Sequence, residues 1–451
     1  MAKDSSDLFK KRSTTHEFLF SHSDESVDRT LADTGLPAGD DAGTMALSAD
    51  FDDIHDREGL VQTIQNEMAA APSLFAVAVH FEWAAGLQNG DGGESTTIEK
   101  SLTPLATTCR SLEGCWARIS RDRFVCVIPR LSAEDGQQTA QSLLNTFEAN
   151  QCPPVTVATA VYPTLGFTRD QIVENVEKAL EHGGFLGPGT ITGFDAVSLN
   201  ISGDRHYQTG NLTGAIDEYR LGLQLDPDDA NLHNSLGVCY GVQSRQEDAL
   251  AAFENAVRLD PQDVMAIYNT GFIHFQKQAY EKALDYFRRA DRLEPDVFEV
   301  VYHIGLTLLK MKMPDKARPY LETAAQANGH SCHAFKSLGE CLAQLELHRE
   351  AIQAYKRVVK KNPTDAESLS SLGQLYLQIG ESLDVATVFA EQSIQLSPDN
   401  GLFRHRLGRI YLQQGKPDRA LAFFEQAIAM GHDSHIDMEV AKAQADAVKA
   451  S

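Results

Sequence analysis

Small and hydrophobic residues recur every 34 positions through the C-terminal half of the chain. Six glycines from Gly203 to Gly373 are spaced by 34 residues, and Gly408 follows after 35. Alanines keep the same spacing and the same single slip: Ala215, Ala249, Ala283, Ala317, Ala351, Ala386 and Ala420. Prolines end most units, at Pro227, Pro261, Pro295, Pro363 and Pro398. Three series in one phase predict an array of structural repeats.

The residue types indicate two packed helices in each repeat. A glycine inside the first helix costs about 1 kcal/mol relative to alanine, so its recurrence indicates close approach of the second helix. The proline ends the second helix because it cannot donate the helical hydrogen bond. We predict seven units that start near residues 196, 230, 264, 298, 332, 366 and 401, and then a polar-faced capping helix over 434–451. In the weakest unit, the fourth, Pro314 and Pro319 are expected to flank the second helix.

The repeat resembles the tetratricopeptide repeat over residues 196–433. The second unit matches best, through Leu236, Gly237, Tyr240, Ala249, Phe253, Ala256 and Pro261. The resemblance implies an all-α superhelical solenoid whose first helices line a concave face, where a partner peptide or helix binds. It therefore predicts a protein-binding adaptor rather than an enzyme.

Carried onto this chain, the family's groove positions give an aromatic and aliphatic stripe. The predicted partner-binding groove consists of Asn234, Tyr268, Phe272, Phe275, Tyr302, Leu306 and Leu309. A stripe of this kind is typical of a helix-docking surface. The alternative is that these side chains close the superhelix on itself or cover the neighbouring domain. The clamp for chaperone C-termini is not expected, since its basic partners are missing.

Residues 51–195 alternate strand and helix patterns, which predicts an α+β domain with helices on the faces of a mixed sheet. The expected helices are 56–71, 97–110, 133–149 and 170–181. The expected strands are 74–81, 116–119, 124–128, 155–162 and 190–194, the second and third forming a hairpin.

The order of these elements resembles the GGDEF domain of diguanylate cyclases. The phrases that carry the resemblance are Ile54-His55-Asp56-Arg57, Trp116 to Ile119, Phe124 to Pro129, Val155 to Ala160 and Val176 to Leu180. The signature turn instead reads Ser120-Arg121-Asp122-Arg123-Phe124, without its glycines and with an arginine for the second acid. The leading metal acid is replaced in His80-Phe81-Glu82. The resemblance therefore implies a bacterial protein with an inactive cyclase-like domain, no catalytic residues and no metal.

The degenerate domain leaves three interpretations open. Its vestigial site, formed by His80, Glu82, Arg121, Asp122 and Arg123, could bind GTP or cyclic di-GMP and regulate the repeats. The domain could instead mediate docking or self-association. The third interpretation is a solvated basic turn on a structural domain.

The composition of the chain argues against some classes of binding partner. A formal net charge of -23 argues against nucleic acid and anionic membrane surfaces. No run has the length of a membrane span, and the acidic start of the chain lacks the apolar core of a secretory leader. Seven cysteines without CxxC spacing favour a reduced, cytoplasmic protein over a disulfide framework. No cofactor is expected.

The remaining segments contain few candidate functional residues. Residues 1–50 are predicted to be a disordered tail, in which 8–12 and 18–20 could be short docking motifs. Residues 89–93 favour a turn over a phosphate or calcium loop, because the flanking ligand residues are missing.

Overall fold

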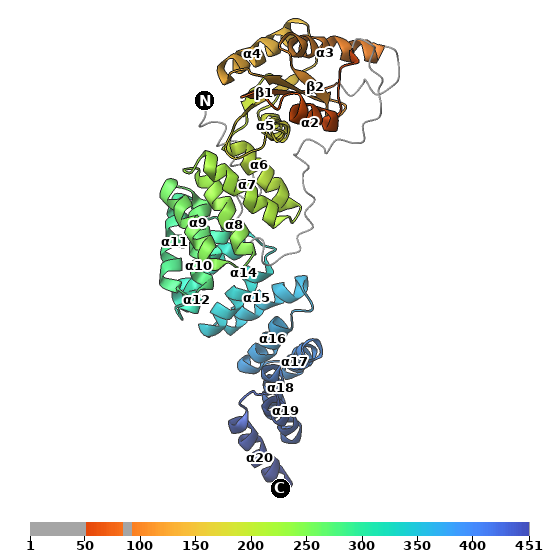
Figure 1. Ribbon diagram of the computed structural model, residues 1–451. Helices are drawn as coiled ribbons and strands as arrows, with labels where there is room; N and C mark the ends of the chain where they lie inside the picture. Colours follow the sequence, from red (N-terminus) through yellow and green to blue (C-terminus); the bar gives the residue numbers. More distant parts are fainter. Residues whose placement is uncertain (1–50, 84–92, 451) are drawn as a thin grey trace. The chain divides into compact units, whose positions relative to one another are not determined.

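The computed structural model describes residues 51–83 and 93–450, so the predicted tail and residues 89–92 lie outside it (Figure 1). The chain divides into two compact units, and the division falls between Ala266 and Ile267. The first unit holds the sheet domain and the first repeat helices, and the second holds the remaining helices. Each unit is described by itself below.

The sheet domain has five strands. They are β1 (Leu74–Phe81), β2 (Cys115–Arg118), β3 (Arg123–Pro129), β4 (Val155–Tyr162) and β5 (Ile191–Gly193). Their order in the sheet is β2-β3-β1-β4-β5, with every pair antiparallel except β4 and β5. The core arrangement of β1 to β4 with two helical crossovers is the split β-α-β-β-α-β topology.

Helices cover both faces of this sheet (Figure 1). They are α2 (Arg57–Asn66), α3 (Gly93–Ser111), α4 (Ala133–Ala149) and α5 (Ile172–Leu186). Strand β1 is buried along its whole length, and Phe75, Val77 and Val79 face α3 and α4. The alternate residues Leu74 and Ala76 face α2 and α5. A strand that is apolar on both faces fits a sheet covered on both sides.

Fifteen helices follow the sheet in the described residues, and the first fourteen of them form seven pairs. The first helices of each pair are α6 (Ala196–Gln208), α8 (Ala230–Val242), α10 (Val264–Gln276), α12 (Phe298–Lys310), α14 (Cys332–Gln344), α16 (Ala366–Ile379) and α18 (Gly401–Gln413). The second helices are α7 (Leu212–Leu225), α9 (Gln246–Leu259), α11 (Tyr280–Leu293), α13 (Pro314–Ala327), α15 (His348–Lys361), α17 (Leu383–Leu396) and α19 (Pro417–Ala429). The first helices begin at the residues where the 34-residue pattern predicts its units.

The repeating glycine lies against a large side chain of the second helix. A Cβ atom at Gly203 would lie 2.3 Å from Cε1 of Tyr219, and one at Gly237 would lie 2.6 Å from the Phe253 ring. Both rings are fully buried. The glycines therefore allow a helix approach that any side chain would prevent.

The fourth pair differs from its prediction in one detail. Pro314 lies in the first turn of α13, where a missing backbone N–H is harmless. Pro319 does not flank α13 but lies inside it. The helix continues through Pro319, and its packing through buried residues such as Leu321 and Ala324 compensates for the lost hydrogen bond.

The last helix, α20 (His435–Ala450), packs on α19 through Ala441 and Ala445. Its outer surface is less polar than predicted, since Ile436 is 81% exposed and Val440 is 44% exposed. Among the described residues no helix is long and apolar enough to cross a membrane. All seven cysteines are free thiols.

We expect Gly203→Ala to destabilise the protein. The new methyl group would overlap Tyr219, whose hydroxyl donates a 2.7 Å hydrogen bond to Asp204 and holds the ring in place. Overpacking of this kind costs about 1–3 kcal/mol, which exceeds the gain in helix propensity of at most about 1 kcal/mol. Urea unfolding followed by circular dichroism measures the change. Gly329→Ala is the control because a Cβ there would meet no atom within 4 Å, and equal stability of the two variants would contradict the packing argument.

Candidate functional site

An aromatic cluster lies where the third and fourth pairs meet. The rings of Tyr268, Phe272, Phe275, Phe287 and Tyr302 surround the imidazole of His303, with centroid distances between 5.0 and 5.7 Å. Tyr268, Phe272 and Phe275 occupy positions four and three residues apart on α10, so they share one face of that helix. His303 is 1% exposed and is the centre of this cluster.

Two hydrogen-bond partners lie beside one ring nitrogen of His303. Its Nδ1 atom lies 2.9 Å from the Tyr268 hydroxyl and 3.0 Å from the Glu299 carbonyl oxygen. Because a carbonyl can only accept, the proton is on Nδ1 when the bond to Glu299 forms. Burial lowers the pKa of His303 to about 4, so the ring is neutral at pH 7. Burial also raises the pKa of Tyr268 well above its ordinary value.

This packing changes what the predicted groove offers to a partner. Tyr268, Phe272 and Tyr302 are at most 5% exposed, and Leu309 is 3% exposed, so they are interior residues and not an open stripe. Aromatic side chains are long enough to fill the space between adjacent first helices, which the spacing pattern alone does not reveal. Phe275 (α10) and Leu306 (α12) are only partly buried and remain accessible.

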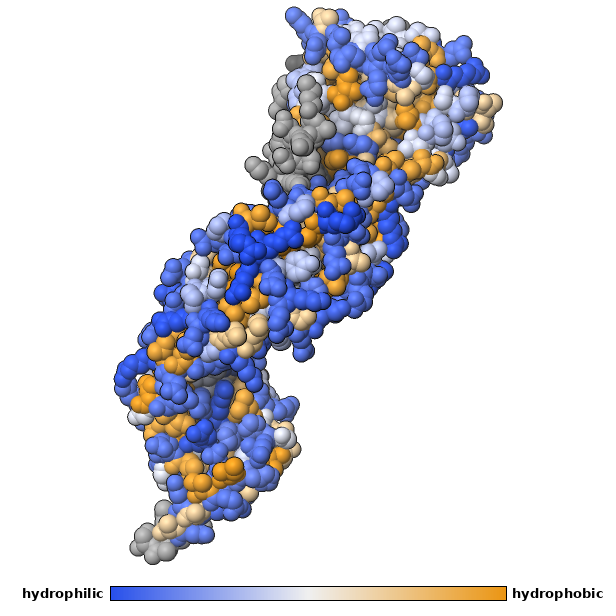
Figure 2. Space-filling view, turned by 90° about the vertical axis from the view of Figure 1, so that its left-hand side faces the viewer, coloured by the Kyte–Doolittle hydropathy of each residue, from blue (hydrophilic) through white to orange (hydrophobic). Residues whose placement is uncertain are grey.

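The last predicted groove residue, Asn234, belongs to the first compact unit. It lies on α8 and is fully buried. On the molecular face drawn in Figure 2, hydrophobic residues form separate patches with hydrophilic residues between them. The accessible apolar part of the predicted groove consists of Phe275 and Leu306, both in the second compact unit.

Charged side chains follow the accessible apolar residues along the first helices of the second unit. Lys336 (α14) forms ion pairs of 3.3 Å with Asp365 and 2.6 Å with Glu367. Burial alone would lower the pKa of Lys336, but these two carboxylates outweigh it and raise the pKa. Arg406 (α18) donates a 2.9 Å hydrogen bond to the Ser370 hydroxyl. Sequence reasoning missed Arg406, because its position gave no signal of a partner on α16.

In the sheet domain, the turn between β2 and β3 is held by its own side chains. The Asp122 carboxylate accepts a 2.6 Å hydrogen bond from the Ser120 hydroxyl and lies 3.2 Å from His80 Nε2. Burial would raise the pKa of Asp122, but these two hydrogen bonds outweigh it and lower the pKa to about 2. Arg118 donates to the backbone carbonyl oxygens of Ser120 and Arg121, at 3.0 and 3.3 Å.

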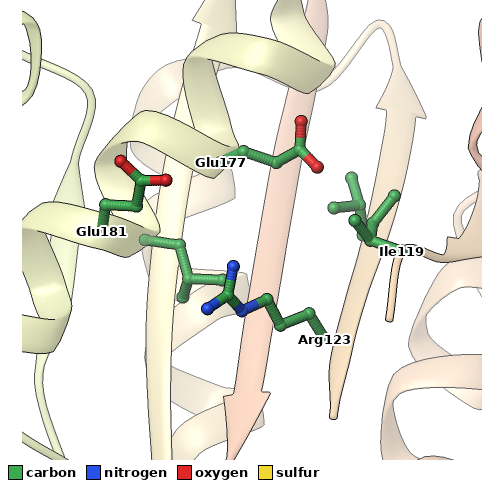
Figure 3. A pocket seen from close by; sticks show the side chains of 6 residues that line it. Ile119, Arg123, Glu177 and Glu181 are labelled. Atoms are coloured by element: carbon green, nitrogen blue, oxygen red, sulfur yellow. The ribbon is translucent and has the colours of Figure 1, made fainter. Parts of the chain in front are cut away.

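The Arg123 side chain lies beside helix α5. The strand register places Arg123 opposite His80, and both face α2 and α5. Figure 3 shows the Arg123 side chain in a small cavity beneath Glu177 and Glu181 of α5. Glu177 pairs with Arg57 at 2.7 Å, and Glu181 pairs with Arg205 of α6. Burial raises the pKa of Glu181.

The structure brings only some of the residues of the predicted nucleotide site together. His80, Asp122 and Arg123 lie together at one end of the sheet, while Glu82 and Arg121 are exposed beside them. The Glu82 backbone N–H donates to the Pro154 carbonyl oxygen at 2.8 Å. Within the part of the chain that the structure describes, no group of three His, Cys, Asp or Glu side chains is arranged to hold a metal ion.

Comparisons with known protein families identify the repeats. Models described as TPR repeat or tetratricopeptide repeat match residues 203–244, 240–297, 302–366 and 381–446. They do not include the sheet domain. A search of the curated proteins returned no match.

Several solved structures are similar to part of this chain. YrrB, described as a TPR protein with an unusual peptide-binding site, is 26% identical, with a TM-score of 0.39 over 42% of this chain and 98% of its own. PilF of Pseudomonas aeruginosa is 23% identical, with a TM-score of 0.42 over 46% of this chain and 95% of its own. A tetratricopeptide repeat protein from Parabacteroides merdae is 19% identical, with a TM-score of 0.40 over 55% of this chain and 98% of its own.

We expect the buried His303 to make stability depend on pH. Its pKa is about 4 in the folded protein against 6.5 for an ordinary histidine, so the unfolded chain binds the proton more tightly. The contribution of His303 to the free energy of unfolding is therefore fully present above pH 6.5. It is lost as the pH falls from 6.5 to 4, and the loss from this group is about 3 kcal/mol. Urea unfolding at several pH values measures the loss, which His303→Gln should remove.

The matched control is His330→Gln, because His330 is exposed in the turn before α14. This control should keep the acid-dependent loss of the unsubstituted protein. The same pH profile for His303→Gln and the unsubstituted protein would contradict the assignment to His303.

Proposed function

This chain is a tetratricopeptide-repeat protein over residues 203–446, and on that premise we propose that it is a non-enzymatic scaffold. The repeats bind a segment of another protein, a peptide or a helix, on the face formed by their first helices. Repeat arrays of this kind use such faces as extended binding surfaces. The free cysteines agree with a cytoplasmic location, which is part of the proposal.

The observation that carries the proposal is the pair of accessible apolar side chains beside a charged row. Phe275 and Leu306 are partly exposed on adjacent first helices, α10 and α12. Lys336, Glu340 and Glu367 follow on the next two first helices, α14 and α16. Apolar anchors with a polar rim are the usual composition of a protein-binding surface. The buried Tyr268, Phe272, Tyr302 and Leu309 support this surface from beneath and do not contact the partner.

We also propose that the sheet domain is a degenerate GGDEF-like domain without cyclase activity. The split topology and the β2–β3 hairpin agree with the resemblance at residues 51–195. The hairpin turn contains one acid, Asp122, and this acid is engaged by Ser120 and His80. A single engaged carboxylate is a poor basis for two-metal phosphoryl transfer.

The rival function is a regulator in which GTP or cyclic di-GMP binds the sheet domain and controls the repeats. The arginines near the turn give it little support. Arg118 holds the turn's carbonyl oxygens, and Arg123 faces the carboxylates of α5. Arg121 alone among the three is exposed. Phosphate recognition usually needs several convergent donors.

We predict that Phe275→Asp and Leu306→Asp each reduce partner recovery at least about tenfold, because a carboxylate would have to be buried against an apolar side chain of the partner. The measurement is affinity capture of the partner from the native host, quantified by mass spectrometry. Circular dichroism should show that each variant remains folded, since both side chains are only partly buried.

Val388→Asp provides the matched control for this experiment. Val388 is 51% exposed on α17, a second helix, so the same change there lies off the proposed face. Recovery should be normal with this variant. Equal recovery by all three variants would contradict the assignment of the binding site to the face formed by the first helices.

For the sheet domain, we expect no binding of GTP or cyclic di-GMP. Isothermal titration of the intact chain with each nucleotide, in the presence of Mg²⁺, should give no saturable heat. Saturable heat that disappears in Arg121→Ala would instead establish the rival function. Incubation with GTP and Mg²⁺ should also yield no cyclic product.

A further inference from the structure

The first repeat helix, α6, is buried on most of its surface. Nine of its 13 residues are buried, including Ala196, Leu199 and Ile201. In a repeat array each helix pair contacts only its neighbours, so a terminal pair should leave one side bare. The opposite terminal helix does so: of residues 435–447 in α20, only Ala441 and Ala445 are buried. Something therefore covers the side of α6 where a preceding repeat would pack.

Helix α5 of the sheet domain covers that side. One side of α5 packs into the sheet core through Val173, Val176 and Leu180. The same helix packs against α6, and its polar residues Lys178 and His182 are buried. Buried polar residues on a helix of a small domain indicate a second interface rather than a solvated surface.

The central contact of this interface is a buried ion pair. Lys178 Nζ lies 2.7 Å from Glu218 Oε1 of α7 and 2.9 Å from Glu174 Oε1 of α5. The side chains of Lys178 and Glu218 are 7% and 12% exposed. Charges this far from water are tolerated only when partners remain in fixed positions, because an unpaired buried charge is strongly destabilising. The pair therefore fixes α5 relative to the first repeat.

Two further contacts lie on either side of this pair. Glu181 of α5 pairs with Arg205 of α6. His182 Nδ1 lies 3.4 Å from Asp195 Oδ1, and the Asp195 side chain caps the N-terminus of α6. Burial would raise the pKa of Asp195, but the nearby His182 ring and the hydrogen bonds from Ser198 outweigh it and lower the pKa. The N-cap of the first repeat helix is thus shared with the sheet domain.

We infer that the sheet domain is the N-terminal cap of the repeat array, with α5 in the place of the second helix of a preceding repeat. Helix α5 belongs to both the sheet core and the array, and the Lys178–Glu218 pair joins them. This arrangement gives the degenerate domain a structural role that needs no nucleotide. It also connects Arg123, which lies beneath Glu181, to Arg205 of α6 through one helix.

The test is hydrogen exchange of the full chain, followed by mass spectrometry of α6 and α7 peptides. In Lys178→Ala the buried Glu218 loses its cation, and exchange in α6 and α7 should accelerate at least about tenfold. Exchange in strand β1 is the internal reference and should not change. Arg349→Ala is the control variant, since it removes an ion pair to Glu381 that is 75% and 50% exposed, and it should leave α6 and α7 unchanged.

A second variant separates lost coupling from a damaged helix. Lys178→Met combined with Glu218→Leu replaces the ion pair with apolar side chains, which is often neutral or stabilising in a buried position. This double variant should restore slow exchange in α6 and α7. The inference is overturned by unchanged exchange in Lys178→Ala, by an equal acceleration in β1, or by a double variant that exchanges as fast as Lys178→Ala.

Discussion

The repeat array depends on one close approach between the two helices of each pair. At Gly203, Gly237 and Gly408 a Cβ atom would lie 2.3 to 2.6 Å from the nearest ring atom of the second helix. Those rings are fully buried in the core of their pair. Interiors are packed too densely for such rings to shift, so the glycine sets the distance between the helices. The surfaces of the repeats that a partner could contact are formed by helices held at this distance.

The same dense packing decides which aromatic residues remain available for binding. In the third and fourth pairs, Tyr268 and Tyr302 are turned inward around His303, which accounts for a neutral imidazole among five aromatic rings. A partner is left with Phe275 and Leu306 and with the charged side chains on the helices that follow. The proposed binding surface thus consists of a few accessible side chains above buried aromatic residues, and not of an open aromatic groove.

A buried ion pair between α5 and α7 joins the sheet domain to the first repeat. The side chains of Lys178 and Glu218 are nearly inaccessible to water. Their ion pair forms only if α5 keeps a fixed position relative to α7. A flexible linker between two independent domains would not need a buried lysine. The sheet domain then has a structural role in the repeat array, because it supplies the helix that covers the first repeat.

The sequence by itself determined the features that depend on local sequence patterns. The helix starts at Ala196, Ala230 and Val264 follow from the 34-residue spacing, and β1, α4 and β4 have their predicted bounds. Such features follow from periodicity, caps and breakers within a few residues. Only the tertiary structure decided that Tyr268 is buried and that Lys178 pairs with Glu218, 40 positions away. In the sequence Lys178 is one charge on an amphipathic helix like many others, since burial and pairing depend on residues that only the folded chain brings together.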